Sequence, residues 1–219
     1  MKKQLIAVAT IMFVGGTMLM TSCKKDDTTS PTITLKGLST ETVIFGTAFV
    51  DPGVTASDDK DGDITLNVST TGAVDQNKAG SYTITYKVAD AAGNEAVQTR
   101  TVIVKFINSS LAANTWSGKD SCSPGPSPSS TYTITINASS SNTADITMVD
   151  FGAFASPLTV SATISGSTGQ TFTIPSQTVS SVLFSGSGTV SSNGKTITYS
   201  YTATDGSGTQ NCTMTLTRP

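Results

Sequence analysis

The chain has 219 residues, no histidine, 13 basic and 15 acidic residues, and a formal net charge of −2. The lack of histidine excludes histidine-based catalytic triads and histidine-liganded zinc or iron sites. The acidic balance disfavours nucleic acid as a partner, because binding a phosphate backbone needs a basic patch. A chain of this length forms one or two domains.

The first stretch has the layout of a bacterial export signal. Lys2 and Lys3 precede an apolar run over residues 5–20, which is shorter than the ~20 residues that a membrane-spanning helix requires. The run ends in Met20-Thr21-Ser22-Cys23, which resembles the lipobox of bacterial lipoproteins. The resemblance implies that residues 1–22 are a signal peptide and that Cys23 carries the lipid, palmitate included. The alternative is an ordinary secretory signal with a chance cysteine.

Residues 23–30 are predicted to be the lipidated cysteine and a polar linker. Lys24-Lys25-Asp26-Asp27 resembles the signal that sends some Gram-negative lipoproteins to the outer face of the outer membrane. We therefore expect an outer-membrane protein that is anchored by lipid and faces the cell exterior. The alternative is a periplasm-facing lipoprotein with a solvated charged linker. After cleavage, 11 basic and 15 acidic residues remain, which leaves a formal charge of −4.

Residues 31–107 alternate apolar and polar side chains with a period of two, which is typical of strands that bury one face. The apolar positions are Ile33, Leu35, Tyr82, Ile84, Tyr86, Val88, Val102, Val104 and Phe106. Turn sequences separate the runs, at Asp51-Pro52-Gly53, Asp61-Gly62, Lys78-Ala79-Gly80 and Ala92-Gly93-Asn94. About seven short strands in this length predict a small Ig-like β-sandwich.

Several motifs of this region resemble the bacterial surface Ig-like domain that is also found in a pesticidal crystal protein (DUF5011). They are Asp51-Pro52-Gly53-Val54-Thr55-Ala56, Asp61-Gly62-Asp63-Ile64-Thr65, Gly80-Ser81-Tyr82-Thr83-Ile84-Thr85-Tyr86, Asp90-Ala91-Ala92-Gly93-Asn94 and Arg100-Thr101-Val102. The resemblance covers about a third of the chain. It implies an extracellular spacer or adhesive module with no catalytic residues to assign.

One acidic cluster in this region, Asp58, Asp59, Asp61 and Asp63, has the chemistry of a metal site. Ca²⁺ prefers several carboxylate oxygens from one loop, and the last three of these residues have the spacing that begins an EF-hand loop. However, Gly62 lies inside the triplet and no glutamate closes the loop, which disfavours an EF-hand. Two interpretations remain: a looser calcium site, and a solvated turn, which we favour. We expect no other cofactor.

Residues 108–219 are rich in serine and threonine and poor in charge, yet they keep the period-two pattern. We expect an antiparallel meander of seven or eight strands, folded as a barrel or as a sandwich. The sequence Asn193-Gly194 predicts a two-residue hairpin turn. Trp116-Ser117-Gly118 resembles the start of lipocalin-like β-domains, and a core tryptophan is the alternative.

With Cys23 lipidated, Cys122 and Cys212 remain as an even pair in an oxidising compartment, so we predict a disulfide between them. This bridge would tie the start of the second domain to its last strand, which suits a closed barrel. The alternative is two separate thiols.

We expect no enzymatic activity, because the chain has two glutamates, no histidine base and no facing carboxylate pair. The predicted function is adhesion, or binding of a glycan or protein, at the cell surface. Phe151 and Phe154 flank Gly152-Ala153 in a predicted loop and are the candidate contact residues. For these two rings, burial in the core is the alternative. A purely structural envelope component with no specific ligand is the alternative function.

Overall fold

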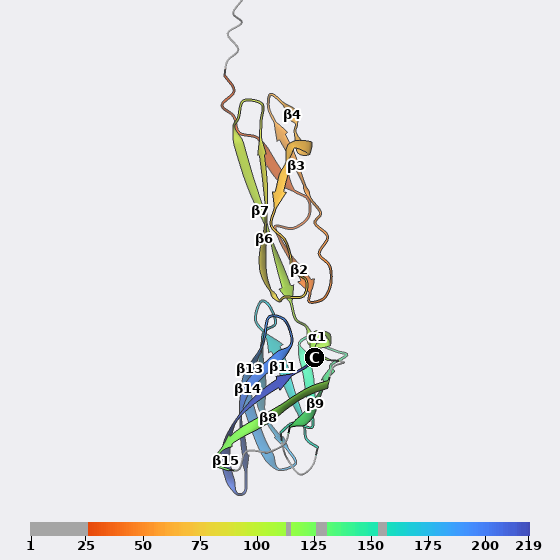
Figure 1. The fold of residues 1–219 in the computed structure, drawn as a ribbon, viewed down its shortest axis with the longest axis vertical. Coiled ribbons are helices and arrows are strands. Elements are labelled where there is room, and N and C mark those ends of the chain that lie inside the picture. The colour runs from red at the N-terminus through yellow and green to blue at the C-terminus, as the bar shows by residue number, and fades with distance from the viewer. Residues whose placement is uncertain (1–25, 113–114, 126–130, 153–156) are drawn as a thin grey trace, which may run out of the picture.

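The computed structural model describes residues 26–112, 115–125, 131–152 and 157–219. The predicted signal peptide and Cys23 lie outside these residues. The fold is all-β, and it consists of an Ig-like domain and a closed β-barrel placed end to end (Figure 1). The first described residues lie at the end of the Ig-like domain that is far from the barrel (Figure 1).

The Ig-like domain is a sandwich of two sheets. One sheet contains β1 (Thr32–Leu35), β3 (Val54–Asp58) and β4 (Gly62–Asp63) in that order, and the 3-10 helix η1 (Thr65–Asn67) follows it. The other sheet has the order β2 (Thr40–Ile44), β7 (Glu95–Lys105), β6 (Gly80–Ala89) and β5 (Ser69–Thr71). Strand β2 runs parallel to β7, and the other pairs are antiparallel. The predicted seven-stranded Ig-like sandwich is confirmed.

The alternating pattern places one face of each long strand in the core. One cluster of buried apolar side chains forms the core of the sandwich: Ile33, Val54, Ala56, Ile64, Ile84, Tyr86, Val88 and Val102. Fully burying one aliphatic or aromatic side chain stabilises the fold by about 1.5–3 kcal/mol relative to leaving it exposed. Burial of this cluster therefore contributes several kcal/mol or more to the stability of the domain.

A completely buried arginine, Arg100, lies within this apolar core. Its Nε donates a hydrogen bond to the Tyr86 hydroxyl at 3.1 Å, and its Nη2 donates to the Lys36 and Gly53 carbonyls at 2.6 and 3.1 Å. The Asp51 carboxylate lies 3.3 Å from Nε. A buried guanidinium must have its donors satisfied, so Arg100 holds the loops around Lys36 and Asp51 against β7.

The second domain is a closed barrel of eight antiparallel strands, which decides between barrel and sandwich. The strands are β8 (Thr115–Ser123), β9 (Tyr132–Ala138), β10 (Asp145–Val149), β11 (Thr159–Ser165), β12 (Thr171–Val179), β13 (Val182–Val190), β14 (Thr196–Asp205) and β15 (Gly208–Thr217). Each strand pairs with the next, and β15 pairs with β8 to close the circle. The short helix α1 (Asn108–Leu111) precedes β8.

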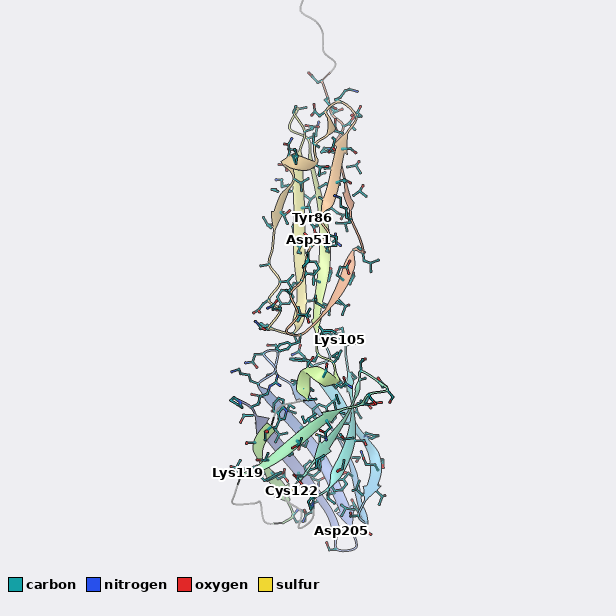
Figure 2. All side chains as sticks on the ribbon, turned by 90° about the vertical axis from the view of Figure 1, so that its right-hand side faces the viewer. Asp51, Tyr86, Lys105, Lys119, Cys122 and Asp205 are labelled. Atoms are coloured by element: carbon teal, nitrogen blue, oxygen red, sulfur yellow. A yellow bond between two sulfur atoms is a disulfide. The ribbon has the colours of Figure 1, made fainter. Side chains whose placement is uncertain are left out.

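The predicted disulfide is present. Cys122 on β8 and Cys212 on β15 are directly opposite residues of the closing strand pair, and their sulfur atoms are bonded. Figure 2 labels Cys122 on the barrel, well away from the Ig-like domain. The bridge therefore joins the first and last strands of the barrel, as expected.

The prediction of a two-residue turn at Asn193-Gly194 is wrong. Strands β13 and β14 are joined by a longer loop, which the hydrogen bond from Ser191 N to the Thr196 carbonyl closes. The Ser192 carbonyl in this loop accepts a hydrogen bond from the amide of Ala79 in the Ig-like domain at 2.7 Å. The loop is thus shaped by a contact with the other domain, which a local turn rule does not include.

The loops at one end of the barrel form the joint with the Ig-like domain. Phe106 N donates to the Thr168 carbonyl at 2.9 Å, and Asn108 N donates to the Thr143 carbonyl at 2.8 Å. Lys105, the last residue of β7, lies at this joint (Figure 2). Three barrel loops, around residues 143, 168 and 192, therefore contact the Ig-like domain or the segment that leaves it.

Phe106 is the centre of the joint. It is fully buried and belongs to the core of the barrel, although it directly follows β7 of the Ig-like domain. Its ring stacks on Phe45 with centroids 4.4 Å apart. A Cβ atom at Gly169, where φ is +66°, would lie 2.2 Å from the Phe106 carbonyl oxygen, so only glycine fits there. The two domains are therefore joined by close packing and not by a free linker.

Candidate functional site

A cleft of about 440 Å³ opens beside the joint. It is lined by Phe45, Asn77, Ser110, Asn193, Lys195, Arg218 and Pro219. The first two residues come from the Ig-like domain, the third from α1, and the others from the β13–β14 loop and the end of the chain. Figure 1 marks the C-terminus beside α1, at the same junction. The fold therefore brings five separate parts of the sequence to one place.

Arg218 is the first of the two cations that line the cleft. Its guanidinium carbon lies 4.8 Å from the centre of the buried Trp116 ring, and its Nη1 donates to the Ser110 carbonyl at 3.3 Å. Its backbone amide also donates to the Lys195 carbonyl at 3.1 Å. Partial burial lowers the pKa of Arg218. A cation this close to an aromatic face is stabilised by the ring quadrupole, so the guanidinium is held in a fixed place.

Gly194 leaves the space in which this guanidinium lies. Its φ is +66°, and a Cβ atom there would lie 2.9 Å from Arg218 Nη2 and 3.0 Å from Phe106 Cε1. The glycine that the sequence marked as a turn residue is therefore needed for the side chains that pack behind it.

Lys195 is the second cation, and its side chain is exposed to solvent. Throughout the described ranges, no carboxylate oxygen lies within ion-pair distance, 4.0 Å, of Lys195 or Arg218. Asn193 beside them is fixed, because its Oδ1 accepts hydrogen bonds from Ser191 Oγ and from Lys195 N. The cleft thus combines two cations, two amide side chains and the ring of Phe45.

The structure separates the four aspartates of the predicted calcium site. Asp61 Oδ2 accepts a hydrogen bond from Ala91 N at 2.7 Å, and Asp63 Oδ1 accepts one from Thr65 N at 2.9 Å. Hydrogen bonding by the Thr65 side chain, and then by its amide, lowers the pKa of Asp63. Both carboxylates therefore bind nearby amides, as the solvated-turn interpretation expects.

Asp58 and Asp59 come together with Asp27 instead. One carboxylate oxygen from each of the three lies within 4.8 Å of the others. Asp59 also pairs with Lys60 at 2.7 Å, and this hydrogen bond lowers the pKa of Asp59. Asp58 Oδ2 accepts from the amides of Lys60 and Asp61. Calcium binding at this end of the Ig-like domain stays a prediction, with Asp27 as a residue that sequence spacing did not indicate.

Phe151 does not form the exposed contact patch that the sequence suggested. Its ring is completely buried in the barrel and packs 4.8 Å from Tyr201 and 5.5 Å from Tyr199, centre to centre. Asp150 and Gly152 both have positive φ, at 61° and 74°, so the chain bends sharply on either side of the ring. The alternative, a ring packed into the core, describes Phe151, whereas Phe154 lies outside the described residues.

A polar cluster inside the barrel was not found from the sequence. Asp120 on β8 is buried and accepts a hydrogen bond from the Tyr201 hydroxyl at 2.7 Å. Burial, and then the charge of Asp120, raise the pKa of Tyr201 and of Tyr199. The Tyr199 hydroxyl is buried and has no hydrogen-bond partner among the residues that the structure describes. The alternation that places Trp116 inside also places Asp120 inside, and this was the available signal.

No helix within the described ranges is long and apolar enough to cross a membrane. Comparison with protein families gives one match: residues 33–104 match the model of the bacterial surface protein, Ig-like domain. This confirms the resemblance drawn from the motifs. Among curated proteins, none matches the chain.

Several solved structures are similar to the chain at low identity. A lipoprotein from Bacteroides thetaiotaomicron is 20% identical, with 84% of this chain and 98% of that chain covered and a TM-score of 0.36. The structure of CBM51-2 in complex with GlcNAc and INT domains from Clostridium perfringens ZmpB is 18% identical, covering 86% and 44%, with a TM-score of 0.30. A DUF3598-family protein of unknown function from Nostoc punctiforme is 13% identical, covering 69% and 66%, with a TM-score of 0.33. Similarity at this level carries no conclusion about function.

Proposed function

We propose that the chain is a non-enzymatic, lipid-anchored protein of the outer membrane that binds a glycan or a protein at the cell surface. The matched surface Ig-like domain supports a place at the cell surface. In this proposal the lipid on Cys23 inserts into the membrane, the Ig-like domain is a spacer, and the barrel is the outer part of the molecule.

One observation carries the proposal: the Ig-like domain separates the first described residues from the barrel (Figure 1). An anchor just before these residues would hold the barrel and the cleft at the far end of the spacer. The packed joint at Phe106 keeps the two domains in line. This arrangement presents a binding cleft to the surroundings, away from the membrane surface.

A structural role is the second candidate, and the outer surface of the barrel favours it. Exposed hydroxyl side chains cover neighbouring strands at Thr171, Thr173, Ser187, Thr189, Thr198, Ser200, Thr213 and Thr215. Such a polar face with little charge suits low-specificity contacts in an envelope layer.

Two experiments test the proposal. In cells, the protein should incorporate a palmitate analogue and be digested by added protease, and Cys23→Ser should abolish the labelling. Labelling that persists in Cys23→Ser would contradict the anchor, and protection from protease in intact cells would contradict surface display.

In solution, the soluble chain from Lys24 to Pro219 should give a saturable hit on a glycan array or against matrix proteins, with or without calcium. A blank in every condition would favour the structural role. A hit that requires calcium and is lost on Asp58→Asn would place the binding site at the other end of the Ig-like domain.

A further inference from the structure

We propose that the cleft at the joint binds a carboxylated sugar, such as a hexuronate residue of an acidic glycan. This inference rests on the proposed function, because it names the ligand class of a surface binding protein. It is carried by the charge, the shape and the side-chain chemistry of the cleft.

Some cations of the molecule are paired with a carboxylate. In the Ig-like domain, Arg100 lies near Asp51, and Lys87 pairs with Glu95 at 2.8 Å. Lys195 and Arg218 instead line one cleft together, with no carboxylate oxygen within 4.0 Å in the part of the chain that the structure describes. In a protein whose net charge is negative, two cations that line one cleft and have no ion pair among the described residues favour an anionic ligand.

Arg218 is fixed before a ligand arrives. The Trp116 ring and the Ser110 carbonyl hold its guanidinium from two sides, and Gly194 leaves room for it. A planar guanidinium binds a carboxylate through two parallel hydrogen bonds. Because burial disfavours the charged form of this arginine, a carboxylate that pairs with it would offset part of that cost.

The other lining groups favour a sugar over a bare anion. Phe45 offers an aromatic ring that stacks on the buried ring of Phe106. Asn77 and Asn193 supply amide groups, which can both donate to and accept from sugar hydroxyls. A cleft of about 440 Å³ falls in the size range of small-ligand sites, which combine apolar walls with a few placed polar groups.

The test is a titration of the chain from Lys24 to Pro219 with trigalacturonate, and with the neutral galactose trisaccharide as the matched ligand. Binding is measured by calorimetry and by the fluorescence of Trp116, the single tryptophan of the chain, which lies beside Arg218. We expect saturable binding of the acidic sugar, weakened by added salt. The neutral sugar should bind about tenfold more weakly or worse, since charge-assisted hydrogen bonds are lost.

Two variants locate the site. Lys195→Gln removes an exposed cation without disturbing packing and should weaken binding about tenfold. Arg218→Lys keeps the charge but loses the planar fork, so it should also weaken binding, and a melting curve will show whether the variant is folded. Lys119→Gln is the control, because Lys119 lies on the barrel away from the joint (Figure 2). It should bind as the unchanged chain does.

The other results would overturn the inference. Equal affinity for the acidic and neutral sugars, or undiminished binding by Lys195→Gln, would show that the cleft does not read the carboxylate. Binding of acetate or sulfate as tight as that of the sugar would show an anion site without sugar recognition. Glycan-array hits that include no acidic sugar would contradict this inference but would still support the proposed binding function. No hit on the glycan array or in the protein screen would contradict the inference and the proposed binding function together.

Discussion

Arg100 and Asp51 form an ion pair in the middle of the Ig-like domain, with Arg100 Nε 3.3 Å from Asp51 Oδ1. The Tyr86 hydroxyl lies 2.8 Å from both oxygens of the same carboxylate, and Figure 2 shows Asp51 and Tyr86 side by side. The three residues come from three of the motifs by which the sequence resembles surface Ig-like domains. These three motifs therefore meet in one network around the buried Arg100, and the role of this network is structural.

Removing the acid of this network should destabilise the domain. Asp51→Ala leaves a fully buried guanidinium without its closest carboxylate, and we expect a loss of about 3 kcal/mol in the free energy of unfolding. Glu41, 3.6 Å from Arg100, limits the loss. Urea denaturation followed by circular dichroism measures the change.

Glu95→Gln is the matched control for Asp51→Ala. It breaks the exposed pair with Lys87, and such surface pairs contribute about 0–1 kcal/mol. Equal and small losses in the free energy of unfolding of both variants would contradict a stabilising role for the ion pair of Arg100 and Asp51.

The disulfide should stabilise the barrel strongly. Cys122 and Cys212 are 90 residues apart in sequence, and closing a loop of that length contributes about 4–5 kcal/mol in the chain-entropy model. The double variant Cys122→Ser, Cys212→Ser should therefore melt at a lower temperature, as reported by Trp116 fluorescence. An unchanged melting curve for this variant would contradict the expectation.

Gly188 of β13 should not tolerate a side chain. A Cβ atom at Gly188 would lie 2.4 Å from Tyr199 Cβ and 2.6 Å from Phe172 Cζ, inside the packed barrel. Overpacking of this kind costs about 1–3 kcal/mol, so Gly188→Ala should lower the denaturation midpoint. Gly206→Ala is the control, since its Cβ would meet nothing within 4 Å, and a similar loss in both variants would reject the packing argument.

The tyrosines inside the barrel should link its stability to high pH. Burial raises the pKa of Tyr201 and Tyr132 well above the ordinary value of 10.0. Both stay neutral in the folded barrel, and the stabilisation from this is fully present below pH 10. As the pH rises further, the unfolded chain releases these protons first, so stability falls.

Phenolate absorbance measured beside circular dichroism tests this. The signal of the barrel tyrosines should appear together with unfolding. Tyr201→Phe keeps the ring but withdraws a donor from the buried Asp120, so it should cost about 1–3 kcal/mol at neutral pH. Phenolate formation by these residues in a barrel that is still folded would contradict the raised pKa values.

Alternating apolar residues are the signal for a strand with one buried face, and β13 lacks this alternation. The reason lies in Gly186 and Gly188, which occupy inward positions where the pattern calls for apolar side chains. The space of a side chain is filled at Gly188 by Tyr199 Cβ and the Phe172 ring, and at Gly186 by the Ser200 carbonyl and by Cα and Cβ of Tyr201, all from neighbouring strands. A prediction from the pattern of a single strand cannot include side chains that neighbouring strands place in its empty positions.

The cleft could not be predicted for a related reason. Phe45, Asn77 and Arg218 are far apart in sequence, and only the joint between the domains brings them together. Conversely, the rings proposed as contacts were chosen from one local stretch, and Phe151 is buried. Local patterns therefore gave the elements and the disulfide, whereas the cleft depends on how the two domains meet.

The placement of β7 has a mechanical consequence. This strand runs beside β2 in parallel and β6 in antiparallel pairing, and it ends directly at the joint. A pull between the first described residues and the barrel acts along the strand axes, because these points lie at opposite ends of the domain (Figure 1). The hydrogen bonds of β7 are then loaded in shear and must break together, so the Ig-like domain resists tension along this direction.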